Sequence, residues 1–269
     1  MDRAKTLIMG ILNITPDSFS DGGSLDSRDA IRRRIDRMLQ AGVDIFDVGG
    51  ESTRPFADPV PEQEEMDRVL PVIERIRRMT DKPISIDTTK AAVAAEALAA
   101  GADIVNDISA LQRDSSMVDI VRNVSGPVII MHMLGTPGDM QINPQYEDVV
   151  ADIASFFEER IGWMTANGIA RERIIIDPGI GFGKTVAHNR TILKNIGEFK
   201  KLGCPILVGH SRKSFLGKTL DLDITRRDCA TAIVSFHCLL QGADILRVHD
   251  VELTRQAVRL YDFLGEKHE

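Results

Sequence analysis

The sequence predicts a single (β/α)8 TIM barrel over residues 1–269, with an active site at the C-terminal ends of its strands. Short apolar runs typical of strands alternate with longer segments of helical periodicity along the whole chain. The strand-like runs are apolar throughout, as in PVIIM, RIIID and PILVG, which is typical of parallel strands that are covered on both faces. The length of 269 residues also suits this fold, for which ~250 residues are usual.

The expected elements form eight successive β/α units. The strands are Thr6–Leu12, Asp44–Val48, Pro83–Ile86, Asp103–Val105, Pro127–Met131, Arg173–Ile176, Pro205–Val208 and Ile245–Val248. The helices are 28–41, 62–79, 89–100, 115–123, 146–167, 187–201, 225–241 and 250–264. Several helices end in a glycine, which supplies a left-handed C-cap. A Gly-(Ala or Val)-Asp phrase then recurs before the strand, at 42–44, 101–103 and 242–244, and resembles an internal repeat.

An open, doubly wound sheet is the rival fold. It usually has a glycine-rich phosphate turn after its first strand. Here Leu12 is followed by Asn-Ile-Thr-Pro-Asp-Ser, which contains no glycine. The closed barrel is therefore favoured.

Composition and charge exclude several classes of protein. Hydrophobic residues make up 43% and charged residues 27%, which is typical of a packed globule rather than a disordered chain. Lys and Arg number 33 against 40 Asp and Glu, so the net charge of -7 argues against nucleic-acid and polybasic membrane-surface binding. No apolar run approaches the ~18 residues that span a bilayer, and the N-terminus lacks a signal-cleavage pattern. We expect a cytoplasmic protein.

The three cysteines, Cys204, Cys229 and Cys238, lack the spacing of a disulfide framework or a zinc site. We expect buried free thiols in a reducing compartment.

Polar side chains stand at the ends of the expected strands. They are Asn13, Asp47, Asp87, Asn106, His132, Asp177, His210 and Arg247. A single polar residue after a strand is a common helix cap. One at every strand end indicates a shared site, because the strands of such a barrel all end at one rim.

These side chains form two chemical sets. Asp87, Asn106 and Asp177 offer acceptors that suit the N–H groups of a flat, aminopyrimidine-like ring. The second set consists of donors that suit phosphate or diphosphate oxygens: Arg54, Lys213, Arg247 and His249. Asn13 offers a neutral oxygen, which suits Mg²⁺ that is otherwise held by waters and substrate phosphates.

The segment DPGIGFGKT at 177–185 ends like a Walker A loop but does not match one, because Pro178 stands where that pattern needs glycine. We interpret it as a glycine-loosened loop that lets the backbone and Phe182 lie close to a ligand. Lys184 is expected to face solvent at the start of a helix. His132 and His210 lack metal-ligand spacing, so ordinary hydrogen-bonded roles are expected for both.

Eight phrases within residues 8–251 closely resemble the dihydropteroate synthase family of pterin-binding enzymes. They are MGILNITPDSFSDGG, DVGGESTRP, ISIDTTK, IVNDISAL, VIIMHMLGTP, IIIDPGIGFGKT, VGHSRKSFLG and DILRVHDV. The resemblance implies condensation of p-aminobenzoate with (7,8-dihydropterin-6-yl)methyl diphosphate to give 7,8-dihydropteroate and diphosphate. It also implies the (β/α)8 barrel, dependence on Mg²⁺, and a homodimer joined through the later helices.

The resemblance further implies roles for individual residues. The pterin ring would be held by Asp87, Asn106, Asp177, Lys213 and the stacked guanidinium of Arg247. The diphosphate would be surrounded by Thr53, Arg54, Arg247 and His249, with Asn13 reaching Mg²⁺. The p-aminobenzoate slot would be bordered by Thr53, Pro55, Phe182 and Ser214. Asp17 and Phe19 would belong to a mobile loop that closes over the substrate with the loop at residues 50–59. The expected catalytic residues are Asp87, Asp177, Lys213 and Arg247.

For the reaction, the resemblance implies substitution at the exocyclic methylene, with substantial C–O cleavage before the amine attacks. Differential stabilisation of the separating charges would then carry catalysis, with no nucleophilic side chain. A methyltetrahydrofolate-type methyltransferase domain shares the barrel and ring pocket, but it has no need of the STRP, SRK and RVH phrases together. A non-catalytic pterin-binding protein would be expected to lack Lys213 or Arg247, and both are present.

Overall fold

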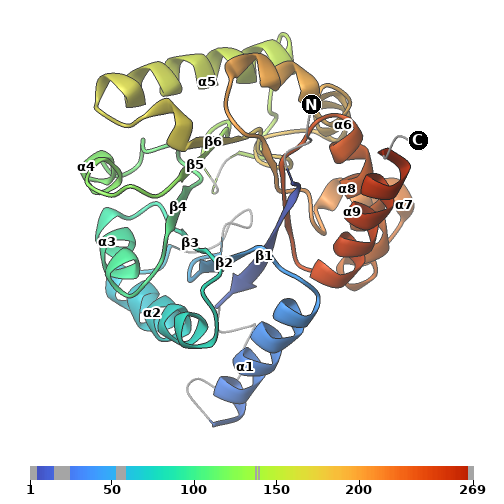
Figure 1. Cartoon of the computed structure of the whole chain (residues 1–269). Coiled ribbons are helices and arrows are strands. Elements are labelled where there is room, and N and C mark those ends of the chain that lie inside the picture. Colours follow the sequence, from blue (N-terminus) through green and yellow to red (C-terminus); the bar gives the residue numbers. More distant parts are fainter. Residues whose placement is uncertain (1–4, 15–24, 53–58, 137, 139, 266–269) are drawn as a thin grey trace.

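Eight parallel strands form the centre of the molecule, and helices surround them (Figure 1). The computed structural model describes residues 5–14, 25–52, 59–136, 138 and 140–265. The strands are β1 Leu7–Asn13, β2 Ile45–Gly49, β3 Ile84–Asp87, β4 Ile104–Asp107, β5 Val128–Met131, β6 Ile174–Asp177, β7 Leu207–Val208 and β8 Ile245–Val248. Their order is β6-β5-β4-β3-β2-β1-β8-β7, and a parallel bridge between Ile176 and Ile206 joins the two ends. The predicted (β/α)8 barrel is confirmed.

The helices follow the strands as expected, with two differences. They are α1 Leu25–Gln40, α2 Glu62–Met79, α3 Ala91–Ala99, α4 Met117–Arg122, α5 Val149–Ala166, α6 Val186–Lys194, α7 Ser214–Leu220, α8 Asp228–Leu240 and α9 Val251–Gly265. The single helix expected at 187–201 is instead α6 followed by a 3-10 helix, Ile196–Leu202, because Asn195 leaves the helical conformation. The second difference is α7, an additional helix of only seven residues that is too short to show a helical periodicity in the sequence. Within the described residues, no helix is long and apolar enough to cross a membrane.

The strands separate two apolar cores. One lies between the sheet and the helices and includes Ile8, Phe46 and Ile86. The other fills the barrel with Met9, Ile45, Ile104, Ile129, Ile175, Leu207 and Ile245. Because successive strand residues point to opposite faces, both faces of each strand are buried. This is why the strand sequences are apolar throughout.

The repeated Gly-(Ala or Val)-Asp phrase closes the bottom of the barrel. Gly42 and Gly242 have φ of 83° and 94°, as a left-handed C-cap requires. The aspartates then accept the backbone N–H of the neighbouring strand segment: Asp44 from Ile8 at 2.9 Å, Asp103 from Ile84 at 2.8 Å and Asp244 from Ile206 at 2.7 Å. The repeat is therefore a device for ending one helix and aligning two strands.

Candidate active site

The acidic and amide side chains of the predicted ring pocket meet on the inner face of the barrel, at the C-terminal ends of β3, β4 and β6. Asp87 ends β3, Asn106 is the second-last residue of β4, and Asp177 ends β6. Each stands two residues beyond a position of the barrel's inner layer, so strand alternation directs it inward. Asn106 and Asp177 are buried.

Arg247 of β8 links this group to a second carboxylate, Asp47 of β2. The Arg247 guanidinium donates to Asp47 Oδ2 from Nε at 2.7 Å, and its Nη2 donates to Asp87 Oδ2. Asn106 Nδ2 donates to Asp47 Oδ1 at 3.3 Å. Asp47 is fully buried, and because it accepts both hydrogen bonds it aligns the Arg247 guanidinium and the Asn106 amide. The sequence placed Asp47 at the rim, but we assigned it no role there.

Burial and neighbouring charges shift the pKa values of the acidic and basic side chains in this pocket. Burial raises the pKa of Asp87 to about 7, against the pull of Arg247 and with the help of the nearby carboxylates of Asp47 and Glu65. Burial likewise raises the pKa of Asp177. Burial and the Arg247 charge lower the pKa of Lys213 to about 8. A pocket of this kind favours a ligand that brings N–H donors to the carboxylates.

The loop after β6 lies against the ring pocket. Gly179 has φ of 69°, and a Cβ there would stand 2.0 Å from the carbonyl oxygen of His132, so only glycine fits. Asp177 Oδ1 accepts the Gly179 N–H at 2.8 Å. Phe182 is buried beside Met131, and the Lys213 ammonium lies 3.9 Å from the centre of its ring. This places an aromatic face next to the ring pocket.

Lys184 contradicts the prediction that it faces solvent, because only 3% of the residue is exposed. Its Nζ lies 3.0 Å from His132 Nδ1 and donates to the carbonyl oxygens of His132 and Phe182. Burial lowers the pKa of Lys184 to about 7, against the attraction of Asp177. A position at the start of a helix usually faces solvent, but here the loop folds back over the end of β5.

The two histidines have the hydrogen-bonded roles that were expected. His132 pairs with Lys184, and its ring packs edge-on against Phe156. His210 Nε2 lies 3.1 Å from the Thr231 carbonyl oxygen and 3.0 Å from Ser235 Oγ. Burial lowers the pKa of His132 to about 3 and of His210 to about 4, so both imidazoles are neutral near pH 7.

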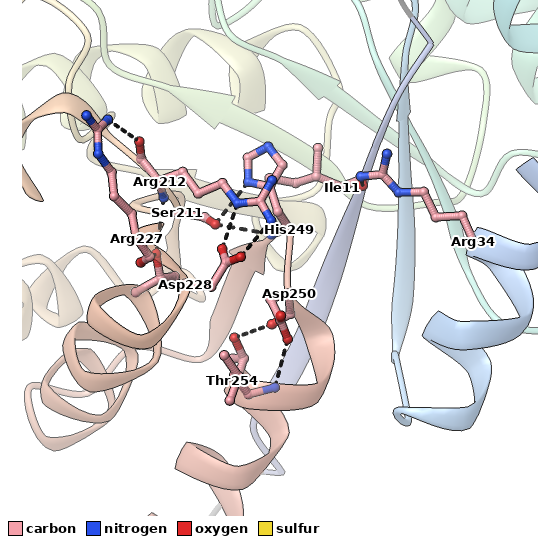
Figure 2. A network of polar contacts seen from close by, with 11 residues as sticks. Ile11, Arg34, Ser211, Arg212, Arg227, Asp228, His249, Asp250 and Thr254 are labelled. Carbon is pink, nitrogen blue, oxygen red and sulfur yellow. Dashed lines mark hydrogen bonds and ion pairs between the residues drawn. The ribbon is translucent and has the colours of Figure 1, made fainter. Parts of the chain in front are cut away.

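A basic group lies on the β8 side of the mouth (Figure 2). His249 Nδ1 is 2.9 Å from Ser211 Oγ. Arg212 is held in a bidentate pair with Asp228, at 2.6 and 2.7 Å. Arg34 reaches from α1 and donates to the Ile11 carbonyl oxygen at 3.0 Å. The positive charges of Arg212, Arg247, Arg34 and Lys213, together with the larger effect of burial, lower the pKa of His249 to about 3. An anion would find donors and positive potential here.

A cavity of about 470 Å³ opens beside Asp87 and extends over the ends of β3, β4 and β5. Its walls include Thr88, Ser109, Ile108 and Met131. Apolar and polar side chains both line it, and its size is that of a small-molecule site.

The remaining predicted residues lie partly outside the described chain. Thr53, Arg54 and Pro55, and likewise Asp17 and Phe19, are outside the described residues. Asn13 ends β1, on the same strand face as Met9, and Ser214 is the exposed first residue of α7. Among the described residues there is no group of three or more His, Cys, Asp or Glu side chains that could hold a metal ion.

Comparisons with known proteins agree with this geometry. The model of the family "Pterin binding enzyme" matches residues 9–249. The dihydropteroate synthase of Haemophilus influenzae is 46% identical over 261 residues, covering 97% of this chain and 94% of that protein. The structure of Xanthomonas albilineans dihydropteroate synthase with 4-aminobenzoic acid is 41% identical with a TM-score of 0.91, covering 99% of this chain and 95% of that one. A complex of the Xanthomonas enzyme with 7,8-dihydropteroate has 38% identity and a TM-score of 0.88, over 99% and 95% of the two chains.

Proposed function

We propose how the mouth of this barrel carries out the dihydropteroate synthase reaction. The chain belongs to the pterin-binding enzyme family. The enzyme is a transferase of folate biosynthesis that condenses p-aminobenzoate with (7,8-dihydropterin-6-yl)methyl diphosphate, giving 7,8-dihydropteroate and diphosphate. The methyltransferase alternative is set aside, because the relatives that match nearly the whole chain are synthases.

The single observation that carries the proposal is the meeting of three acceptors at one barrel mouth, two of them buried and the third, Asp87, with only 9% of its side chain exposed. Asp87, Asn106 and Asp177 come from three strands and point to a common space. A pterin ring presents a row of N–H donors along one edge, and carboxylates bind such donors strongly. Lys213 lies within the field of Asp87 and Asp177 and offers the complementary donor for a ring acceptor.

Charge separation is the step that this site is arranged to favour. As diphosphate leaves the exocyclic methylene, positive charge spreads into the pterin, where Asp87 and Asp177 stabilise it. Negative charge grows on the diphosphate, where Arg247 and His249 are available as donors. Within the described residues, Nη1 of Arg247 has no partner, because the pairs with Asp47 and Asp87 use Nε and Nη2. Thr53 and Arg54 complete the proposed diphosphate site.

The amine nucleophile needs a slot beside this centre. We assign that slot to Phe182 and Ser214, together with Thr53 and Pro55. Phe182 is buried against Met131 and presents its ring beside Lys213. An aromatic ring packs well against the flat face of p-aminobenzoate. An arylamine is weakly basic, so its attack needs no strong general base.

The amide oxygen of Asn13 is a ligand that suits Mg²⁺. Asn13 ends β1 with a neutral amide oxygen, and Mg²⁺ commonly takes few protein ligands while substrate phosphates and waters supply the rest. Mg²⁺ bound there would neutralise charge on the departing diphosphate. The protein's part in this step is to hold Asn13 at the strand end and to aim Arg247 and His249 at the same oxygens.

We also propose a cytoplasmic homodimer joined through the later helices. In the described residues, exposed apolar side chains gather in this part of the chain, at Leu220, Ile233, Leu240, Leu260, Phe263 and Leu264. Such a surface favours association with a second copy. Cys204 and Cys238 are buried free thiols as expected, whereas Cys229 is free but exposed, and free thiols suit a reducing compartment. Light scattering of the purified protein would test the dimer, and a single monomer mass would contradict it.

One assay tests the proposed function. Purified protein is incubated with both substrates and Mg²⁺, and diphosphate release is followed with and without p-aminobenzoate. We expect release that depends on p-aminobenzoate and stops when EDTA removes the metal. Release at the same rate without the amine would contradict the condensation. Release that EDTA leaves unchanged would contradict the role given to Mg²⁺ and Asn13.

A further inference from the structure

A buried ammonium group joins the loops that follow β5 and β6. Lys184 Nζ has three neighbours at hydrogen-bond distance: His132 Nδ1 at 3.0 Å, the His132 carbonyl oxygen at 3.2 Å and the Phe182 carbonyl oxygen at 2.8 Å. An ammonium has three donors, so its capacity is filled. All three acceptors are neutral, which distinguishes this group from the ion pairs of the protein surface.

Hydrogen bonds from uncharged side chains hold the residues on either side of Phe182. Tyr146 Oη donates to the Gly183 carbonyl oxygen at 2.9 Å, and Asn189 Oδ1 accepts the Gly181 N–H at 2.8 Å. Within the described residues, Lys184 is the one side chain that donates both to the Phe182 carbonyl oxygen and to the His132 carbonyl oxygen of the other loop. Gln141 and Tyr146 join the two loops at the carbonyl groups of Gly181 and Gly183, and Lys184 joins them at the carbonyl group of Phe182 itself.

The Phe182 ring is fixed in turn against groups of the active site. It packs with Ile108, Met131 and Met140, and the Lys213 ammonium lies 3.9 Å from its centre. A shift of the Phe182 backbone would displace the ring from Lys213 and change the space beside the ring pocket. Displacements of about 1 Å far from the reacting atoms can cost large factors in rate.

A lysine is a costly choice for this position. Burying an ammonium is unfavourable unless it is fully hydrogen-bonded, and an apolar side chain of similar length would avoid the cost. Replacing it would leave the carbonyl groups of His132 and Phe182 without their donor. The charge is also felt by Asp177, whose ionised form it favours. The arrangement thus serves the position of the loop rather than the stability of the fold.

We propose that Lys184 is a positioning residue for the p-aminobenzoate slot, which it sets by holding Phe182 against Lys213 through the cross-link to His132. The inference rests on the proposed function, in which Phe182 borders that slot. Lys184 itself bonds to none of the side chains assigned to the pterin ring, so its main effect falls on p-aminobenzoate. Loss of its charge near Asp177 accounts for the smaller change expected with the pterin diphosphate.

The test is the variant Lys184→Met, with Tyr146→Phe as the matched control that removes a hydrogen bond from the same loop but leaves Phe182 alone. We expect the KM for p-aminobenzoate to rise about tenfold in Lys184→Met, while kcat and the KM for the pterin diphosphate change less than about threefold. Tyr146→Phe should change all three constants less than about threefold. Equal rises in both KM values, or no change in either, would overturn the proposal.

Hydrogen exchange of the segment 178–186 gives a readout that does not depend on activity. Faster exchange there in Lys184→Met than in Tyr146→Phe is expected, and equal exchange in the two variants would overturn the proposal. If the unaltered protein makes no dihydropteroate, the proposed function fails, whereas exchange still decides whether Lys184 fixes the loop. If Lys184→Met does not fold, Lys184→Gln, which keeps a donor without the charge, takes its place under the same criteria.

Discussion

The lower and upper layers of the barrel interior use the same strands and the same inward face for opposite purposes. In the lower layer, Ile45, Ile104, Ile175 and Ile245 pack together with the other members of the barrel core. Two residues further along the same strands stand Asp47, Asn106, Asp177 and Arg247. A separation of two residues keeps the side chain on the same face, since strand side chains alternate. Position along the strand alone therefore separates the stabilising layer from the chemical one.

The two layers also make opposite contributions to the stability of the fold. Burying an aliphatic side chain stabilises the fold by about 1.5–3 kcal/mol. Burying charged groups destabilises it unless each finds a partner, and here Arg247 is held between Asp47 and Asp87. The upper layer therefore depends on the lower one for stability. Substitutions in the lower layer should reduce stability and spare the chemistry, and substitutions in the upper layer should do the reverse.

The largest effect is expected from Asp177→Asn in the upper layer. The amide replaces a charged acceptor of ring N–H groups with a neutral one that also presents a donor, and hydrogen bonds to charged groups contribute about 1.5–3 kcal/mol each. We expect kcat/KM for the pterin diphosphate to fall about 100- to 1,000-fold, with the melting temperature nearly unchanged. Kinetics close to those of the unaltered enzyme would contradict the role of Asp177.

The lower layer is probed by Ile129→Ala, which opens a cavity among fully buried side chains. Substitutions of this kind cost about 2–5 kcal/mol of unfolding free energy. Denaturant unfolding should show that loss, while kcat/KM per folded molecule stays within about threefold. A large loss of activity in the folded fraction would break the separation between the two layers.

Arg247→Lys should be damaging although it preserves the charge. An ammonium cannot bridge Asp47 and Asp87 while presenting a further donor, and it cannot lie flat against a ring. We expect about a 10- to 100-fold loss of kcat/KM for the pterin diphosphate. Steady-state kinetics with each substrate varied in turn would measure it, and unchanged constants would tell against the assignment.

Acidification should separate binding from stability at Asp87. Its pKa is raised to about 7, chiefly by burial, so its carboxylate takes up a proton in the folded protein as the pH falls below 7. A protonated carboxyl is a poorer acceptor for ring N–H groups, and the affinity for an uncharged pterin alcohol should fall toward tenfold per pH unit below 7. Titration calorimetry between pH 5.5 and 8.5 measures this.

The same proton has the opposite effect on the free energy of unfolding. Because the folded-state pKa lies above the unfolded value, Asp87 contributes stability below its unfolded pKa, and that contribution is lost as the pH rises through about 7. In Asp87→Asn both pH dependences should weaken. If pterin affinity in the unaltered protein were constant across this range, the raised pKa of Asp87 would be wrong.

The pattern of residues along the chain is sufficient to predict the fold and the location of the site. Strands buried on both faces need apolar side chains at every position, so runs such as those of β5 and β6 are recognisable without any structure. Polar residues at the ends of those runs then mark the rim, since parallel strands of a barrel end together. On this basis Asp87, Asn106, Asp177, Lys213 and Arg247 were placed at one mouth, and the structure brings them there.

Which of these groups contact one another depends on how the barrel closes. Asp47 pairs with Arg247, 200 residues away in the sequence, only because the barrel closes and sets β2 and β8 on either side of β1. Lys184 stands at the start of a helix, a position that predicts exposure to solvent, yet the loop folds back and buries it against His132. Periodicity fixes the face and the end of a strand, but a contact across the barrel depends on closure, loop path and packing, which no local pattern encodes.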